Sequence, residues 1–108
     1  MKNKKGGLKS HPPFKKEHKL ISLSLSTGLK GDANLELGNI SEALDLYVSA
    51  ASDYVNEFTT PYFMMKQAFI HEKNEEFKLA LEIYNSIKED YPKSKEGFSI
   101  DKYISSAS

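Results

Sequence analysis

The chain has 108 residues, of which 39% are hydrophobic and 28% charged, which suits one small domain with a modest core and excludes a multidomain enzyme. It contains no cysteine, so disulfides, thiolate metal sites and a cysteine nucleophile are excluded. Every basic residue is a lysine, and without the planar guanidinium groups that most often read base edges we expect no specific nucleic-acid binding.

The charge is divided unevenly along the chain. Residues 1–19 hold seven lysines and one glutamate, a formal charge of +6, whereas residues 20–108 hold eight lysines and fourteen acids, a charge of −6. The basic segment also contains glycine and proline pairs and few large apolar side chains, too few to offset the entropy of ordering it. We therefore predict a disordered basic tail over 1–19 and a folded domain over 20–108.

The first part of the domain changes its periodicity near residue 29. Residues 20–26 alternate apolar residues with serine as a strand would, but no second alternating run exists to pair with them. From Leu29 onward apolar residues recur every three or four positions, which predicts two helices separated by a tight turn at Gly38 and Asn39, in a hairpin over 29–55. Asn39 and Glu42 have the spacing of a capping box.

The second half of the domain shows the same helical periodicity. Thr60 followed by Pro61 is a typical helix start, and we predict a hairpin over 61–91 whose first helix runs from 61 to 73. Tyr91 and Pro92 close it, because the residue before proline is pushed out of helical geometry. A terminal helix over 94–105 with Ser94 as its cap completes a fold that we predict to be all-α.

The chain contains an internal repeat with an offset of 37 residues. The segment Glu-Ala-Leu-Asp-Leu-Tyr at 42–47 falls on Leu-Ala-Leu-Glu-Ile-Tyr at 79–84. Small residues recur at the positions where paired helices would approach closely, and bulky residues recur where gaps would need filling. Each unit is therefore predicted to be a helical hairpin.

The repeat resembles the tetratricopeptide repeat (TPR) family over roughly residues 29–92. The small and aromatic positions that carry the likeness are Gly31, Ala33, Leu37, Gly38, Ala43, Tyr47 and Ala50 in the first unit and Ala68, Ala80, Tyr84 and Pro92 in the second. The resemblance implies two antiparallel TPR hairpins followed by a short capping helix. It also implies a non-catalytic protein-interaction module or assembly scaffold.

Three segments, at 29–38, 58–66 and 91–94, are similar to the carboxy-terminal repeats of Bacteroidetes-type envelope TPR proteins. That group is in turn similar to the ancillary translocon-subunit family. The resemblance implies a bacterial, membrane-anchored and periplasmic setting for a longer parent protein. No run in this chain approaches the ~18 apolar residues of a membrane span, so we expect the chain as given to be soluble.

A stripe on the helix over 61–73 is the candidate binding surface. Tyr62, Met65 and Phe69 follow a three-four spacing on a face other than the one that closes the hairpin. The TPR resemblance implies that the first helix of each hairpin lines a concave surface, and an acidic rim there would favour a peptide or partner helix flanked by lysine or arginine. The alternative is that the helix containing Leu29 simply covers the stripe. The predicted partner-binding residues are Asp32, Leu35, Glu36, Tyr62, Met65, Phe69 and Glu72.

Two other functional classes stay open. His71 with Glu72, Glu75 and Glu76 would suit a small metal-dependent hydrolase, although the second histidine of a zinc motif is missing. The lysine-rich tail would suit binding to a membrane surface or to nucleic acid through counterion release. No set of acid, base and nucleophile converges in the sequence, so we expect that the chain is not an enzyme and binds no cofactor or metal. The partner that we expect is a protein or peptide, and self-association is a further possibility.

Overall fold

The computed structural model describes the backbone of residues 5–108 and the side chains of residues 16–108. Over this part of the chain the secondary structure is helical, without strands, which confirms the predicted all-α class. The helices are α1 (Lys5–Glu36), α2 (Ile40–Ser52), α3 (Thr59–Lys73), α4 (Phe77–Asp90) and α5 (Lys95–Ala107).

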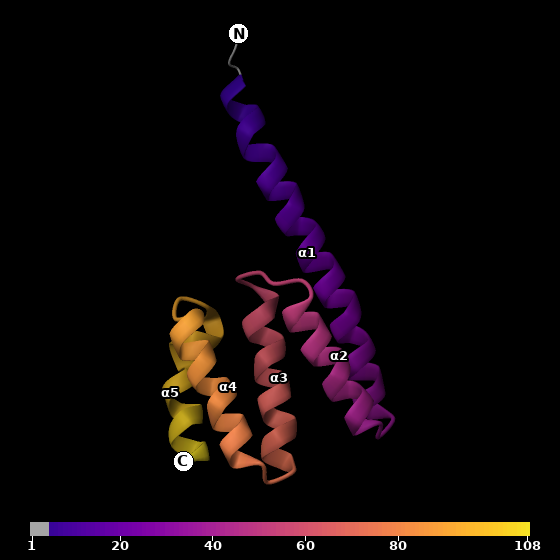
Figure 1. The fold of residues 1–108 in the computed structure, drawn as a ribbon, viewed down its shortest axis with the longest axis vertical. Coiled ribbons are helices and arrows are strands. Elements are labelled where there is room, and N and C mark those ends of the chain that lie inside the picture. The colour runs from indigo at the N-terminus through magenta and orange to yellow at the C-terminus, as the bar shows by residue number, and fades with distance from the viewer. Residues whose placement is uncertain (1–4) are drawn as a thin grey trace.

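The helices pack in chain order as antiparallel neighbours. Short turns join α1 to α2 and α3 to α4, so each pair forms a hairpin, and α5 packs against both α4 and α3 (Figure 1). Helix α3 also contacts α1, so the first helix of each hairpin and α5 lie next to one another on one side of the molecule. This arrangement is what positions the candidate site.

The two hairpin turns have the same geometry at an offset of 37 residues. Gly38 and Asn39 donate their amides to the carbonyl oxygens three and five residues earlier, at 3.0 and 2.8 Å. Glu75 and Glu76 repeat these two bonds at 2.9 and 2.7 Å. Gly38 and Glu75 both have left-handed backbones, with φ values of 85° and 62°. The sequence repeat therefore corresponds to a structural repeat, a helix end of the Schellman type.

Two hydrophobic clusters lie on either side of α3. One joins α2 to α3 around Tyr47 and Phe63, and the other joins α3, α4 and α5 around Tyr84 and Ile100. Tyr47 and Tyr84 are 37 residues apart and both are fully buried. Each repeat therefore places one tyrosine at the centre of its own cluster.

Helix α1 approaches its neighbours through glycines. A methyl group built on Gly28 would lie 2.0 Å from Cζ of Phe63, and one built on Gly31 would lie 2.7 Å from Cε1 of Tyr47. No side chain larger than hydrogen fits there without movement of a ring. Gly28 and Gly31 thus set the distance between α1 and the cluster around Tyr47 and Phe63.

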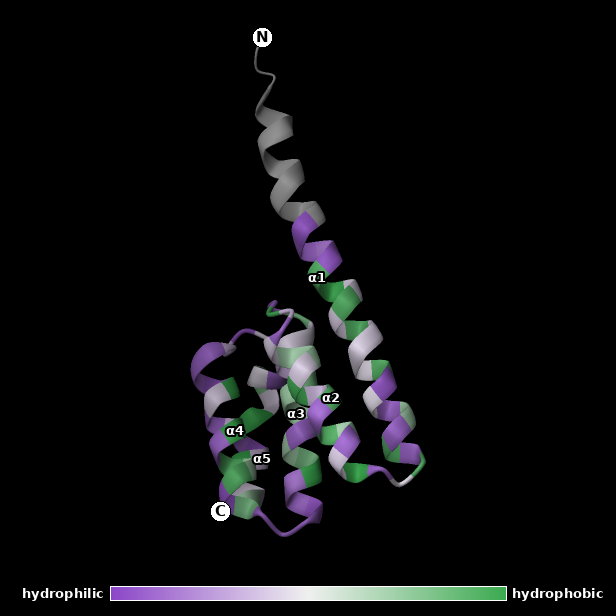
Figure 2. Ribbon diagram, turned by 45° about the vertical axis from the view of Figure 1, so that its right-hand side comes forward, coloured by the Kyte–Doolittle hydropathy of each residue, from purple (hydrophilic) through white to green (hydrophobic). Residues whose placement is uncertain are grey.

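Helix α1 begins further upstream than residue 29, where the sequence pattern places the start of the first hairpin. Residues 20–26, which alternate like a strand, belong to this helix, and hydrophobic and hydrophilic residues are interspersed along its described part (Figure 2). The buried side chain of this stretch is Ser24, which donates to the carbonyl of Ala50 at 2.8 Å and accepts from Thr59 at 2.7 Å. Of the tail predicted to be disordered, residues 1–4 lie outside the described residues, and α1 includes the rest.

The helix caps differ in part from the predictions. Asn39 makes no capping bond to α2, because its side chain donates instead to Oδ1 of Asn34 at 3.1 Å, so the capping box is wrong. Helix α3 begins at Thr59, where Oδ1 of Asn56 accepts the amides of Phe58 and Thr59. Ser94 is the N-cap of α5 as predicted, since its Oγ accepts the amide of Gly97 at 2.9 Å.

Candidate functional site

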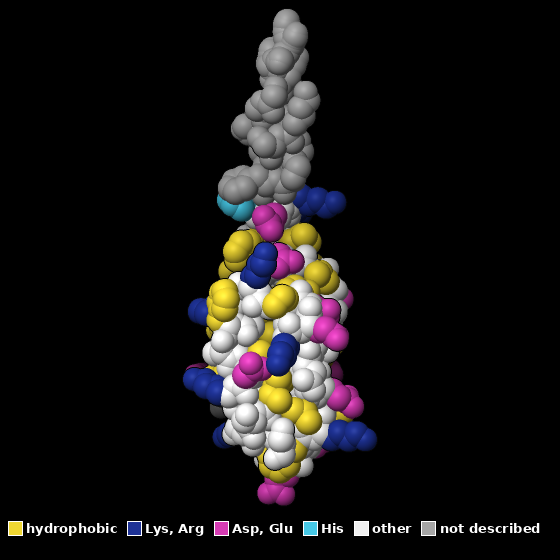
Figure 3. Space-filling view, turned by 90° about the vertical axis from the view of Figure 1, so that its left-hand side faces the viewer, with side chains coloured by type: hydrophobic (Ala, Val, Ile, Leu, Met, Phe, Trp, Pro, Cys, Tyr) yellow, Lys and Arg dark blue, Asp and Glu magenta, His cyan; other side chains and the backbone are white. Residues whose placement is uncertain are grey.

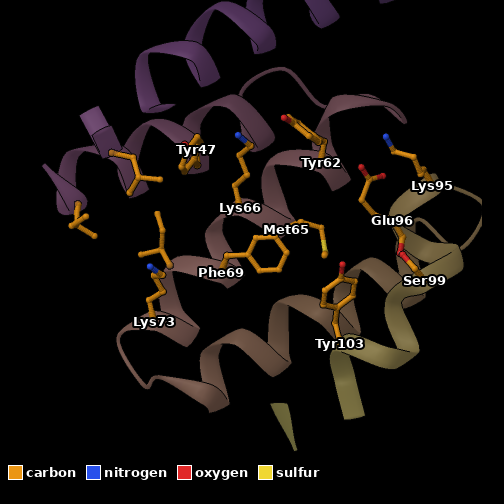
Figure 4. Close-up of a pocket in the computed structure, with 13 residues that line it drawn as sticks. Tyr47, Tyr62, Met65, Lys66, Phe69, Lys73, Lys95, Glu96, Ser99 and Tyr103 are labelled. Carbon is orange, nitrogen blue, oxygen red and sulfur yellow. The ribbon is translucent and has the colours of Figure 1, made fainter. Parts of the chain in front are cut away.

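A groove of about 710 Å³ crosses α3 between the end of α1 and helix α5 (Figure 4). Helix α3 supplies its floor, α1 and the start of α2 supply one wall, and α5 supplies the other. The residues that line it are Leu35, Ile40, Tyr47, Tyr62, Met65, Lys66, Phe69, Ile70, Lys73, Lys95, Glu96, Ser99 and Tyr103.

The floor of the groove is apolar and partly exposed. Met65 is 7% exposed and belongs to the core beneath, whereas Tyr62 and Phe69 are 40% and 42% exposed. The ring of Phe69 lies 5.8 Å from the ring of Tyr103 across the junction of α3 and α5. Neighbouring elements therefore cover Met65 but leave the rings of Tyr62 and Phe69 partly exposed to solvent.

A polar cluster fixes the edge of the groove nearest α1. The carboxylate of Asp32 accepts the hydroxyl of Tyr47 and an ammonium hydrogen of Lys66, whose Nζ lies 2.8 Å away. The same Nζ lies 5.1 Å from the ring centre of Tyr62 and 5.6 Å from that of Tyr47. Helices α1, α2 and α3 are thus joined at one carboxylate.

The titration of this cluster follows from its contacts. Burial alone would raise the pKa of Asp32, but the hydrogen bonds from Lys66 and Tyr47 outweigh burial and hold that pKa below its ordinary value. Burial, followed by the hydrogen bond to Asp32, raises the pKa of Tyr47. Asp32 is therefore charged and Tyr47 is neutral at physiological pH.

The charged side chains that line the groove are mostly lysines. Lys66 is paired with Asp32, while Lys73 and Lys95 form no ion pair within the described residues. Glu96 is the acidic residue among the lining side chains. The groove thus has a local excess of positive charge, although residues 20–108 have a formal charge of −6.

The structure brings four of the seven predicted binding residues together. Leu35, Tyr62, Met65 and Phe69 all line the groove. The three predicted acidic residues do not line it. Asp32 is engaged with Lys66 at the edge, Glu36 is exposed near the end of α1, and Glu72 accepts the hydroxyl of Tyr84 at 2.5 Å, on the side of α3 that faces α4.

Sequence reasoning missed the lysines and the whole α5 wall. Lys66 and Lys73 follow Tyr62 at helical spacing, so the periodicity of α3 could have placed both on the groove side. Lys95 and Tyr103 belong to a helix outside the two repeats, and no sequence feature relates them to Tyr62. The acidic rim predicted from Asp32, Glu36 and Glu72 is therefore absent from the groove lining, where lysines predominate among the charged side chains.

The histidine cluster does not form a metal site in the structure. Nδ1 of His71 lies 2.8 Å from Oε1 of Glu76, across the turn between α3 and α4. Within the described residues, no group of three or more metal-ligating side chains lies close enough together to hold an ion. The same part of the chain contains no helix that is long and apolar enough to cross a membrane.

Other exposed hydrophobic residues lie outside the groove. On the face formed by α4 and α5, small groups of hydrophobic side chains alternate with lysines and acids, and Phe98 of α5 is the most exposed of the large hydrophobic residues described (Figure 3). Helix α1 and the turn that follows it expose Leu23, Leu25, Leu29 and Leu37 outside the groove. The groove differs from both surfaces because it is concave.

Comparison with protein-family models, with curated proteins and with solved structures finds no match to this chain.

Proposed function

We propose that this chain is a non-catalytic interaction module or assembly scaffold of the TPR type, which binds a short peptide or a partner helix in the groove across α3. The observation that carries the proposal is the open, apolar floor at Tyr62 and Phe69, framed by α1 and α5. Aromatic and methionine side chains are enriched at protein interfaces and at adaptable binding surfaces.

Three features of the structure support the assignment to the TPR type. The hairpin turns repeat at 37 residues, each repeat buries one tyrosine, and the first helices of the hairpins lie side by side with α5. A concave surface formed by the first helices is the binding surface that the resemblance implies. The absence of a convergent catalytic set in the sequence supports binding without catalysis.

We also propose that this protein functions in a bacterial cell envelope. This proposal rests on the similarity of 29–38, 58–66 and 91–94 to Bacteroidetes-type envelope TPR proteins. The genomic sequence upstream of Met1 tests it. An in-frame membrane helix followed by further hairpins is the expected result, and a stop codon directly upstream would contradict it.

Selection from a displayed library of random twelve-residue peptides on the immobilised full chain tests the binding function. We expect enriched peptides that shift the amide resonances of 62–69 and 99–103 in a ¹⁵N-labelled sample. Counter-selection on Phe69→Ala removes peptides that still bind the variant, so the groove-directed peptides should stay in the pool. Absence of enrichment, or peptides that shift only resonances outside the groove, would refute the proposed function.

A further inference from the structure

At each end of its apolar floor the groove has a lysine that forms no ion pair with any other side chain that the structure describes. Lys95 lies at the Tyr62 end, because Tyr62, Lys95 and Glu96 also line a second, neighbouring pocket. Lys73 lies at the other end of α3, beyond Phe69 (Figure 4). Tyr62 and Lys73 are eleven residues apart, which corresponds to about 16 Å along the helix axis.

The third lysine is not equally available to a ligand. Lys66 lies between the two ends, where the carboxylate of Asp32 and the rings of Tyr47 and Tyr62 hold its ammonium group. The middle of the groove is therefore nearly neutral and apolar, with Phe69 exposed to an incoming side chain and the half-buried ring of Tyr103 beside it. The two ends carry positive charge, moderated at one end by Glu96.

We infer that the groove selects a protein segment with an apolar or aromatic anchor in its middle and acidic residues on both sides. This inference rests on the proposed function and specifies the chemistry of the partner. The spacing of about 16 Å suits a helix of about eleven residues or an extended segment of about five. Acidic flanks complement Lys73 and Lys95, whereas basic flanks would leave like charges facing each other.

A second copy of the chain is disfavoured as the occupant by charge. A second copy would bring its basic segment 1–19, with a formal charge of +6, together with a body of −6, so the copy as a whole is neutral and offers the lysines no net attraction. A small acidic segment of another protein meets the lysines without bringing such a basic segment close. An acidic partner segment is therefore the occupant that the charge distribution favours.

The composition of the selected peptides provides the first test. Among the groove-directed peptides recovered as described above, we expect acidic residues on both sides of one or two aromatic or aliphatic residues. Recovery of groove-directed peptides with neutral or basic flanks would overturn this inference while leaving the proposed function intact. Failure to recover any groove-directed peptide would refute the proposed function itself.

Charge reversal provides the second test, with fluorescence anisotropy of the best peptide on the full chain. Lys73→Glu and Lys95→Glu should each weaken binding about five-fold, because an attractive pair becomes a repulsive one. Lys78→Glu, at another exposed lysine on α4, changes the net charge identically and should weaken binding less than about two-fold. Equal losses in all three variants would overturn the inference, because they would show only a net-charge effect.

Two further measurements distinguish a local charge effect at the groove from a loss of folding or from self-association. Lys73→Gln and Lys95→Gln should weaken binding by a smaller factor than the reversals, and circular-dichroism melts should match the parent chain. If the chain dimerises in sedimentation experiments and Lys95→Glu abolishes the dimer, the occupant is a second copy and the inference is overturned. An affinity that is unchanged between low and high salt would also contradict it.

Discussion

Asp32 is the residue at which α1, α2 and α3 are held together. Its carboxylate accepts from Tyr47 and Lys66, and these bonds keep its pKa below the ordinary value of 3.8. A carboxylate with a depressed folded-state pKa contributes stability that is present above its unfolded pKa and lost as the pH falls through the folded one. The contribution should therefore begin to fall as the pH approaches about 4 and be lost at lower pH, where Asp32 becomes protonated in the folded chain as well.

Asp32→Asn tests this contribution directly. At pH 7 the substitution should lower the free energy of unfolding by about 1 kcal/mol, because the half-exposed ion pair is screened and the amide oxygen still accepts a hydrogen bond. Urea titrations of parent and variant at pH 7 and at pH 3 measure the difference. An unchanged difference at the two pH values would show that the charge of Asp32 plays no part.

Glu75 has a backbone conformation that suits glycine. It occupies the left-handed position that Gly38 takes in the first turn, with φ of 62°. A residue with a Cβ is strained there, so Glu75→Gly should raise the free energy of unfolding by about 0.5–1 kcal/mol despite the added freedom of the unfolded chain. Gly38→Ala should lower it by a similar amount. Chemical denaturation measures both, and a destabilising Glu75→Gly would contradict the structural equivalence of the two turns.

The sequence predicted one of these turns better than the other. Gly38 followed by Asn39 is a typical helix end, so the first turn was evident from residue types alone. Glu75 has no such preference, and only its offset of 37 residues from Gly38 relates the two positions. At Asn39 the residue type was misleading. Asparagine is a common helix cap, but the side chain of Asn39 bonds to Asn34 instead of to α2.

At the scale of elements, the packing of α1 depends on Gly28. Gly28→Ala adds a methyl group 2.0 Å from the ring of Phe63, and this clash outweighs the gain in helix propensity. We expect a net loss of about 2 kcal/mol in the free energy of unfolding, measured by thermal or urea denaturation. Ser22→Ala, at an exposed position of the same helix, should change it by less than about 0.5 kcal/mol.

A second substitution separates a clash at Gly28 from a general effect on α1. Phe63→Leu in the Gly28→Ala background should cost less than the same change in the parent chain, because the smaller side chain makes room for the methyl group. Strictly additive losses would mean that Gly28 and Phe63 do not pack against each other.

The extent of α1 could not be read from its hydrophobic pattern, for a physical reason. In the stretch 20–26 the side chain facing the core is Ser24, stabilised by hydrogen bonds to α2 and α3, while Leu23 and Leu25 are exposed. Periodicity assumes that apolar residues face inward, and this segment reverses the assumption. Helices α2 to α5 bury apolar faces in the usual way, and their order was predicted correctly.

At the scale of the whole molecule, the first hairpin has an uncovered side. Leu29 and Leu37 of α1 are 64% and 76% exposed, and two hairpins fall short of the three or more units that usually share a continuous core. We predict that a second copy, packing outside the groove, or another protein covers this end. Sedimentation at micromolar and nanomolar concentrations measures self-association, and a stable, cooperatively folded monomer at both would contradict the prediction.

The charge of the groove was the least predictable property of the site. The apolar stripe on α3 is local to one helix, so its spacing was sufficient to find Tyr62, Met65 and Phe69. The basic character depends on Lys95, which reaches the groove only because α5 folds back against α3. Such long-range juxtaposition leaves no trace in local sequence patterns.

Truncation of Phe69 is the most direct test of the central claim that this groove is a binding surface. Because Phe69 is 42% exposed, Phe69→Ala should weaken binding of a groove-directed peptide by about 1–3 kcal/mol while the chain stays folded at room temperature. Peptide affinity, with thermal melting of the same samples, gives the answer. Retained affinity, or a loss of stability of about 3 kcal/mol or more that unfolds the domain, would show that Phe69 serves the core and not a partner.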